Sequence, residues 1–218
     1  MGTDNLFHKR KAKKLERNKP TRKRYDKVLI VCEGSKTEPN YFNELKDHYE
    51  IDTANIMISG ECGSDPVSVV RHGEELFRQS ARLNDPFDKV YCVFDRDKHT
   101  NFDEAVTVLN SLKPAEVFTA ITSTPCFELW FILHFTYTSS PLESNGNKSC
   151  GARTLQELER YWPDYSKGLN GSFSHLFGQL ETAKAFSSQL LAESEKNGSK
   201  NPLTTVHQLV AYLQNIKS

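Results

Sequence analysis

The sequence lacks several features that would assign it to a large class of proteins. No stretch approaches ~18 uninterrupted apolar residues, the length that a membrane-spanning helix needs, so we expect no membrane span. The N-terminus is charged and no apolar segment follows it, which argues against a secretory signal. The 5 cysteines form no C-x-x-C pair, so neither a zinc site nor a disulfide framework is indicated. These absences favour a reducing compartment, and we expect a cytoplasmic protein.

Two common phosphate-binding loops are also missing. "GSKT" (34–37) is similar to the end of a P-loop, but Ser35 stands where that motif requires glycine. No G-x-G-x-x-G occurs. "VFDRDKH" contains the Asp-x-Asp of haloacid-dehalogenase-type phosphatases, whose nucleophilic aspartate follows the first strand, whereas this one follows the third predicted strand. We therefore do not expect nucleotide binding through either loop, or that phosphatase chemistry.

The charges are unevenly distributed although the formal net charge is zero. Residues 1–24 hold 10 of the 28 Lys and Arg residues, but only two acidic residues, Asp4 and Glu16, so the remainder is acidic. A basic arm on an acidic body favours a polyanionic partner such as nucleic acid. A solvated tail without a specific ligand explains the same composition equally well.

Apolar runs alternate with helical patterns over the first part of the chain. Val- and Ile-rich runs predict buried strands, and each is followed by apolar residues at helical spacing. This rhythm predicts an α/β fold with a parallel sheet of about four strands and helices on both faces. The predicted strands are 27–32, 55–59, 88–94 and 116–123, and further helices are expected at about 153–162, 174–195 and 203–216 after a surface loop at 137–152.

These patterns divide the chain into three parts. They are a flexible basic arm (1–24), an α/β core (25–136), and a loop and helical C-terminal region packed on the core (137–218). Asp65 followed by Pro66 predicts an N-cap and first position of a helix. Ser35 and Glu38 have the spacing of a capping box, which we favour over a functional role for Glu38.

Three carboxylates follow predicted parallel strands. Glu33 comes after the first strand, and Asp95 and Asp97 after the third, so all three are expected at one edge of the sheet. Clustered carboxylates repel one another unless a cation neutralises them, and Mg²⁺ prefers such oxygen ligands. Glu33 is then a ligand or a general acid or base. Singly, each acid is better explained by helix capping or a solvated turn, but their joint placement favours a metal site.

Four segments together resemble the RloB-like family. They are "IVCEGSKTEPNYF", "VFDRDKH", "STPCFELWFILHF" and "NPLTTVHQLV", and the resemblance covers about residue 24 to the C-terminus. A glutamate after the first strand and Asp-x-Asp after the third also resemble a Toprim domain, the catalytic module of topoisomerases, primases and several nucleases. RloB-like proteins are encoded near restriction-modification loci and, with an ATPase partner, in antiphage systems.

The resemblance implies a Mg²⁺- or Mn²⁺-dependent Toprim-type endonuclease that acts on DNA or RNA, tRNA included, in antiviral defence by abortive infection. It places Glu33, Asp95 and Asp97 at the Toprim acidic positions. It also places Glu38, Glu128, His134 and the Asn201-Pro202 pair inside family motifs without assigning their roles. The oligomeric state stays open.

The remaining candidates are each open to two interpretations. Glu128 begins an apolar aromatic helix and is either a fourth carboxylate of the site or a favourable charge at the helix start. His134 lies on the apolar stripe of that helix, which favours a hydrogen-bonded core residue over a catalyst. Lys36, Arg96 and Lys98 are predicted to bind substrate phosphate, although solvated surface charges are the alternative; Lys167 and Tyr165 are two more possible contacts.

The predicted function is metal-dependent phosphodiester cleavage with Glu33, Asp95, Asp97 and Glu128 as catalytic residues. No tyrosine nucleophile is identifiable, which argues against a topoisomerase. Two alternatives remain open. The first is a non-catalytic nucleic-acid-binding or regulatory subunit whose acids hold only a structural ion. The second is a nucleotidyl- or phosphoryl-transfer enzyme that uses the same acids.

Overall fold

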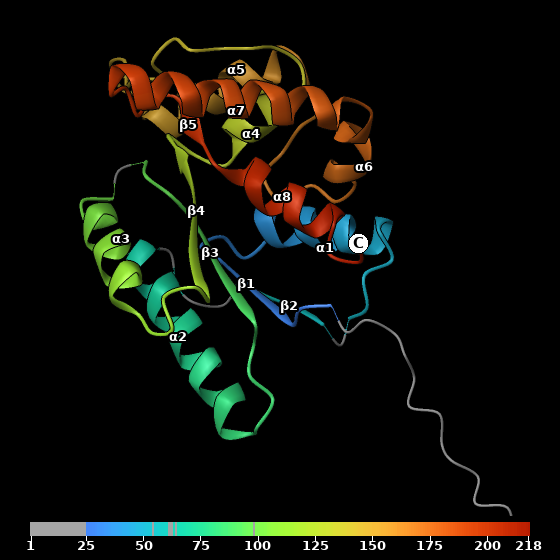
Figure 1. Cartoon of the computed structure of the whole chain (residues 1–218). Helices are drawn as coiled ribbons and strands as arrows, with labels where there is room; N and C mark the ends of the chain where they lie inside the picture. Colours follow the sequence, from blue (N-terminus) through green and yellow to red (C-terminus); the bar gives the residue numbers. More distant parts are fainter. Residues whose placement is uncertain (1–24, 54, 61–62, 64, 98) are drawn as a thin grey trace, which may run out of the picture.

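The computed structural model describes residues 25–218 except 54, 61–62, 64 and 98. The predicted basic arm (1–24) and Lys98 lie outside the described residues. The predicted α/β fold is confirmed: a mostly parallel sheet has helices on both faces, and a helical region follows it (Figure 1).

The sheet has the order β2-β1-β3-β4-β5. Its first four strands are parallel neighbours, and β5 runs antiparallel to β4. The strands are β1 (Val28–Cys32), β2 (Ile56–Ser59), β3 (Lys89–Asp95), β4 (Phe118–Thr124) and β5 (Leu203–Thr204). All four predicted strands are therefore present, and a short fifth strand extends the sheet.

The central strand β1 shows why the sheet is covered on both faces. All five of its residues are buried. Val28, Ile30 and Cys32 belong to one hydrophobic cluster, whereas Leu29 and Val31 belong to another. Because successive side chains of a strand point to opposite faces, a strand buried on both sides reads as a continuous apolar run.

Different helices cover the two faces of the sheet (Figure 1). On one face, α2 (Pro66–Arg82) packs on β1 and β3, and α3 (Phe102–Ser111) packs on β4. On the other face, α1 (Thr37–His48) lies against β2, and α8 (Val206–Gln214) lies against β4. The last helix of the chain thus packs on the sheet at β4 and shares a hydrophobic cluster with residues of β1, so the C-terminal region is part of the same core.

Two predicted helix starts have different outcomes. Asp65 is the N-cap of α2, where its side chain accepts a hydrogen bond from the Ser68 N–H at 3.2 Å and Pro66 opens the helix, as predicted. The capping box at the start of α1 is wrong, because the N-cap is Lys36 and no side chain caps the helix. Glu38 is instead buried, with 6% of its surface exposed.

The aromatic helix after β4 is shorter than its apolar spacing predicts. The helix α4 comprises only Glu128–Ile132. Beyond it, the His134 N–H donates to Phe131 O at 3.1 Å, and the Phe135 N–H donates to Ile132 O at 2.9 Å. These bonds span three residues rather than four, so the apolar side chains continue in tight turns.

The C-terminal region contains more elements than predicted. They are α5 (Cys150–Glu159), α6 (Ser172–Leu176), a 3₁₀ turn η1 (Phe177–Gln179), α7 (Leu180–Asn197), β5 and α8. The single helix expected at 174–195 is therefore divided, and the expected helix at 203–216 begins only at Val206. The two residues of β5 pair with β4 instead, and the Ser123 and Thr204 hydroxyls lie 3.0 Å apart.

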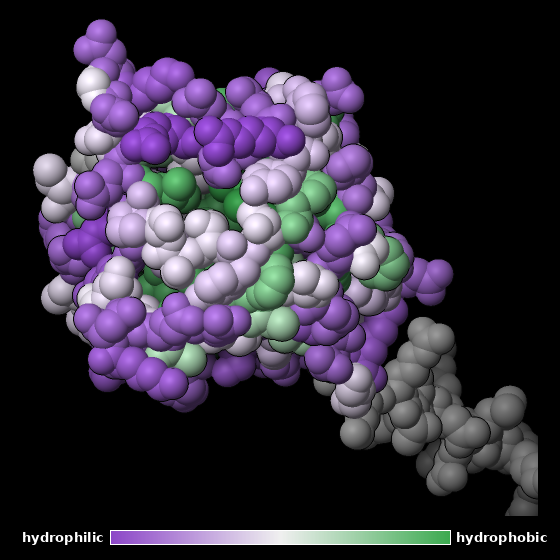
Figure 2. Space-filling view, turned by 90° about the horizontal axis from the view of Figure 1, so that it is seen from above, coloured by the Kyte–Doolittle hydropathy of each residue, from purple (hydrophilic) through white to green (hydrophobic). Residues whose placement is uncertain are grey.

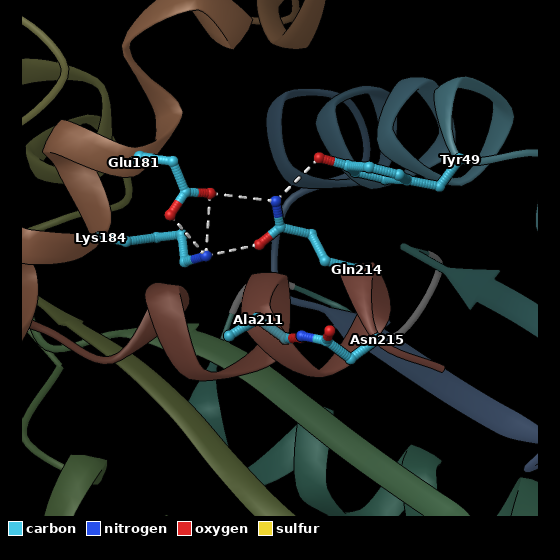
Figure 3. Close-up of polar contacts among 6 residues, drawn as sticks. All are labelled: Tyr49, Glu181, Lys184, Ala211, Gln214 and Asn215. Atoms are coloured by element: carbon cyan, nitrogen blue, oxygen red, sulfur yellow. Dashed lines mark hydrogen bonds and ion pairs between the residues drawn. The ribbon is translucent and has the colours of Figure 1, made fainter. Parts of the chain in front are cut away.

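Gln214 fixes the end of α8 against two other helices (Figure 3). Its Oε1 accepts from Lys184 Nζ of α7 at 2.7 Å, and its Nε2 donates to the Tyr49 hydroxyl at 2.8 Å. Lys184 in turn donates to both oxygens of Glu181 at 3.0 Å. One amide therefore joins α8, α7 and the end of α1.

The surface seen in Figure 2 is mostly hydrophilic around its rim, and small hydrophobic areas lie between paler side chains. Four large hydrophobic residues are exposed among those described: Met57, Leu83, Tyr161 and Phe177. Within the described part of the chain, every helix is too short or too polar to cross a membrane.

We predict that Asp65→Ala lowers the free energy of unfolding by about 1 kcal/mol, because α2 loses its N-cap. The same carboxylate also accepts from Asn101 Nδ2 at 2.9 Å, which ties α2 to the start of α3. Urea denaturation measures the effect. Glu195→Ala, an exposed change within α7, is the matched control and is expected to be nearly neutral. Equal midpoints for the two variants would contradict the capping role.

Candidate active site

The ends of β1 and β3 bring two acids together, as their positions in the sequence predicted. Glu33 directly follows β1, and Asp95 is the last residue of β3. The Glu33 N–H donates to Val93 O at 3.0 Å, and the Asp95 N–H donates to Glu33 Oε2 at 3.0 Å. The Glu33 carboxylate thus adds one hydrogen bond to the backbone hydrogen bonds between β1 and β3, and this bond fixes the position of its side chain.

A cavity of about 310 Å³ lies at this edge of the sheet. It contains five acidic side chains and, among the described residues that line it, three basic ones. The acids are Glu33, Glu38, Asp95, Asp97 and Glu128, and the bases are Lys36, His99 and Lys167. The four predicted catalytic residues and the predicted phosphate contact Lys36 therefore share one cavity.

His99 holds the second oxygen of Glu33. Its Nε2 lies 2.8 Å from Glu33 Oε1. Burial raises the pKa of Glu33 above its usual value, although the Asp95 N–H and His99 act against that rise by stabilising the carboxylate. Both oxygens of Glu33 therefore have donors from the protein.

Asp95 is held by the turn that begins α4. Its Oδ2 accepts from the Phe127 N–H at 3.0 Å. Burial is the main cause that raises the pKa of Asp95 well above its usual value, followed by repulsion from Glu38, Glu128 and Glu33. This carboxylate is thus in an environment that strongly favours a proton or a nearby cation.

Asp97 lies on the exposed side of the same cavity. Its N–H donates to Pro125 O at 2.8 Å, which holds the loop after β3 against the turn after β4. A Cβ added to Gly151 would lie 3.4 Å from Asp97 Oδ2, so the first turn of α5 lies against this carboxylate.

Glu38 reaches the cavity because Gly34 leaves room for it. A Cβ at Gly34 would collide with Glu38 Oε2, so only glycine allows this approach. Burial raises the pKa of Glu38 to about 7, and repulsion from Glu128 and Glu33 adds to the rise, whereas its own backbone N–H and Lys167 lower the pKa. Glu38 is therefore a fifth carboxylate of the cavity and not a helix cap.

Glu128 contacts a segment from the C-terminal region. The Tyr165 hydroxyl donates to Glu128 Oε1 at 3.2 Å, and Lys167 Nζ lies 3.5 Å from the same oxygen. The Glu128 carboxylate raises the pKa of Lys167, since it favours the charged ammonium. Glu128 thus lies in the cavity, 2% exposed, with one cation beside it.

The other predicted substrate contacts are placed differently. The Arg96 guanidinium lies 3.0 Å from Asp103 Oδ2 and packs on the Phe102 ring, outside the acidic cavity. It lines a neighbouring cavity of about 340 Å³ that shares Asp97. Asn201 also lines that neighbour, and its amide bonds to the Leu142 backbone. Lys98 lies outside the described residues.

His134 is a core residue, as its position on an apolar stripe predicted. It is 2% exposed, and its Nδ1 lies 2.9 Å from Trp130 O. Burial lowers its pKa to about 4, so the imidazole is neutral near neutral pH.

Sequence reasoning assigned no site role to Glu38 or His99. The spacing of Ser35 and Glu38 suggested a cap, although a glutamate flanked by Pro39, Tyr41 and Phe42 was a signal of burial. His99 lies two residues after Asp97 in the same loop, and this position was the signal that could have placed it in the site. No local pattern pointed to the approach of Lys167, which depends on the fold of the C-terminal region.

The site fits a hard divalent cation in its chemistry. The carboxylates offer oxygen ligands, and their pKa values are raised mainly by burial and further by repulsion between acidic neighbours. Among the described residues, however, no group of three or more His, Cys, Asp or Glu side chains is arranged to hold a metal ion. Mg²⁺ commonly uses only one or two carboxylates and takes its other ligands from water and substrate phosphate, and the cavity offers Asp95 and Asp97 among its acids.

The fold and the cavity together define a class: an α/β protein with an acidic site at the carboxyl edge of a parallel sheet. A family model described as RloB-like protein matches residues 28–213, and the chain therefore belongs to the RloB-like family. Comparisons with curated proteins and with solved structures give no match.

We predict that Glu38→Gln removes a loss of stability that the wild-type protein shows as the pH rises from 4.5 to about 7. In the unfolded chain Glu38 loses its proton near its usual pKa of 4.5, whereas in the fold it does so at about 7. The stability from this proton is fully present below the lower value and is lost as the pH rises through the higher one. The shift corresponds to a loss on the order of 3 kcal/mol, which the glutamine variant avoids.

Thermal unfolding in EDTA between about pH 4 and about pH 8 measures this difference. Glu195→Gln is the control, because Glu195 is exposed on α7 and is expected to leave the pH profile unchanged. If the unfolding temperatures of wild type and Glu38→Gln change with pH in parallel, the raised pKa of Glu38 in the folded protein is refuted.

We also predict that Gly34→Ala destabilises the protein by about 1 kcal/mol, the low end for forcing a methyl group into an occupied space, because the group it meets is the end of a side chain. The added Cβ displaces the Glu38 carboxylate from the cavity. Chemical denaturation measures the loss. Gly178→Ala is the matched control, since nothing lies within 4 Å of a Cβ built there. If both variants are equally stable, the contact between Gly34 and Glu38 is not as tight as described.

Proposed function

We propose that this RloB-like protein is a Mg²⁺- or Mn²⁺-dependent nuclease that hydrolyses phosphodiester bonds of DNA or RNA, tRNA included, in antiphage defence. The observation that carries the proposal is the single cavity in which carboxylates from the ends of β1, β3 and α4 lie beside basic side chains. The likeness to Toprim domains supports this reaction class, and the family resemblance supports the defence role and an ATPase partner protein.

Asp95 and Asp97 are the residues that would hold the cation. Asp95 Oδ2 accepts from the Phe127 N–H, which leaves Oδ1 for a ligand role. Asp97 is exposed at the mouth of the cavity, within reach of solvent and substrate. A bound Mg²⁺ would polarise the phosphate and offset its negative charge.

Glu33 is better suited to carry a proton than to bind the cation. Its Oε2 accepts from the Asp95 N–H, and its Oε1 lies 2.8 Å from His99 Nε2. A carboxylate with both oxygens held by donors keeps its orientation, and its raised pKa brings it closer to the range of a useful general acid or base. His99 orients Glu33 through this contact.

The basic side chains serve the polyanionic substrate. Lys36 lines the cavity and is exposed, so it is available to a phosphate group. The arm at 1–24 and Lys98 are proposed to contact the nucleic-acid backbone, which would make binding sensitive to salt.

A second candidate is a non-catalytic nucleic-acid-binding or regulatory subunit of a defence complex. It is favoured by the finding that no three potential metal ligands of the described residues are arranged around one ion. Such a subunit would bind nucleic acid with or without Mg²⁺ and leave it intact.

We predict that the wild-type protein cleaves nucleic acid only with Mg²⁺ or Mn²⁺, and that Glu33→Gln lowers the rate at least about 100-fold, the usual contribution of a general acid or base. Asp97→Asn is expected to lower the rate and to raise the Mg²⁺ concentration that gives half the maximal rate. Gel assays with DNA, RNA and tRNA measure both effects, and the products separate hydrolysis from nucleotidyl transfer.

Glu195→Gln is the control and is expected to cleave at the wild-type rate, because Glu195 is exposed on α7. Equal cleavage by wild type and Glu33→Gln would rule out the role of Glu33. Binding without cleavage under every metal condition would favour the non-catalytic subunit.

A further inference from the structure

Lys167 reaches the acidic cavity from a part of the chain that contributes no other charge to it. The residue lies between α5 and α6, in a segment without regular secondary structure. Its Nζ lies 3.5 Å from Glu128 Oε1, and the residue lines the same cavity as Glu33 and Asp95.

Two hydrogen bonds hold this segment on the start of α1. The Gly168 N–H donates to Thr37 Oγ1 at 3.0 Å, and Asn40 Nδ2 donates to Gly168 O at 3.0 Å. The position of Lys167 is therefore fixed by its neighbour rather than by its own ion pair.

The same contact brings two lysines together. Gly168 has a φ of +77°, and a Cβ added there would lie 2.9 Å from Lys36 Cβ. Glycine is thus required both by the backbone conformation and by the side chain of Lys36. Lys36 thus packs against Gly168, the residue that follows Lys167 in the chain. Both lysines line the cavity.

The ion pair with Glu128 uses only part of the hydrogen-bonding capacity of the Lys167 ammonium. An ammonium has three donors, and among the described residues its one ion-pair partner is Glu128. The Tyr165 hydroxyl already donates to the same Glu128 oxygen, at the shorter distance of 3.2 Å. Moreover, 63% of the Lys167 side chain is exposed, whereas 3% of the Glu128 side chain is. Donors of Lys167 are therefore left for a ligand from solvent.

A phosphate group that enters this cavity meets five carboxylates and needs compensating cations. We infer that Lys167, with Lys36, binds the phosphate of the nucleic-acid strand that the cavity cleaves, and that the 165–168 segment is a substrate-binding element. The inference rests on the proposed nuclease function and names the contact that recognises its substrate. Lysine suits this task because its ammonium is a compact charge on a flexible stem.

The test is binding of labelled single-stranded DNA and RNA by the full chain, measured by fluorescence anisotropy with Ca²⁺ in place of Mg²⁺. Lys167→Gln is expected to raise the Kd about tenfold, the effect of losing one charge-assisted hydrogen bond. It is also expected to lower the slope of log Kd against log salt concentration by about one. Lys167→Arg keeps the charge and is expected to restore most of the affinity.

Lys113→Gln is the matched control. Lys113 is exposed between α3 and β4, at the opposite end of the parallel strands, and its substitution is expected to change neither quantity. A thermal melt of each variant separates lost binding from lost folding.

The double variant Glu128→Gln with Lys167→Gln separates substrate binding from neutralisation of Glu128. If Lys167 binds phosphate, the double variant stays as weak a binder as Lys167→Gln. If the double variant regains wild-type affinity, Lys167 serves only Glu128 and the inference is overturned.

Different results contradict the role of Lys167 and the nuclease function. Wild-type cleavage together with wild-type affinity and salt dependence in Lys167→Gln overturns the role of Lys167 alone. A wild-type protein that neither binds nor cleaves any of the nucleic acids overturns the nuclease proposal and this inference with it.

Discussion

The hydrogen bond from the Asp95 N–H to Glu33 Oε2 joins the ends of β1 and β3, and the arrangement of the site depends on it. The backbone N–H of the last residue of β3 is satisfied by the side chain of Glu33, the residue that follows the neighbouring strand β1. Burial raises the pKa of both carboxyl groups in this arrangement. The fold therefore brings negative charge together where it is costly, and that cost is reduced by protons, by His99 and Lys167, or by a cation.

The parallel core was largely predictable, because its signals are local. Continuous apolar runs such as Val28–Cys32 give buried strands, and Asp65 with Pro66 gives a helix start. From four parallel strands, the meeting of Glu33 and Asp95 follows by topology alone. The same reasoning explains why His134 was correctly interpreted as a core residue: its neighbours on the helical stripe are all apolar.

The parts that escaped prediction depend on contacts between distant residues. Glu38 has the spacing of a cap, but the room that Gly34 leaves allows its carboxylate to enter the cavity. Thr204 lies within the helix expected at about 203–216, yet in the structure it pairs with Ser123 of β4. The approach of Lys167 depends on hydrogen bonds between Gly168 and α1, more than a hundred residues away in sequence. No local pattern encodes such pairings.

The attachment of Gly168 to Thr37 and Asn40 has a consequence for the order in which the molecule is made. A ribosome synthesises β1, β3 and α4 well before residues 165–168, and the strand β5 and helix α8 that complete the sheet and its covering come last. A nascent chain that has folded only its first four strands holds the carboxylates without Lys167. The cavity acquires Lys167 only late in translation, so a chain terminated before residue 165 carries the acidic side chains of the cavity without this lysine.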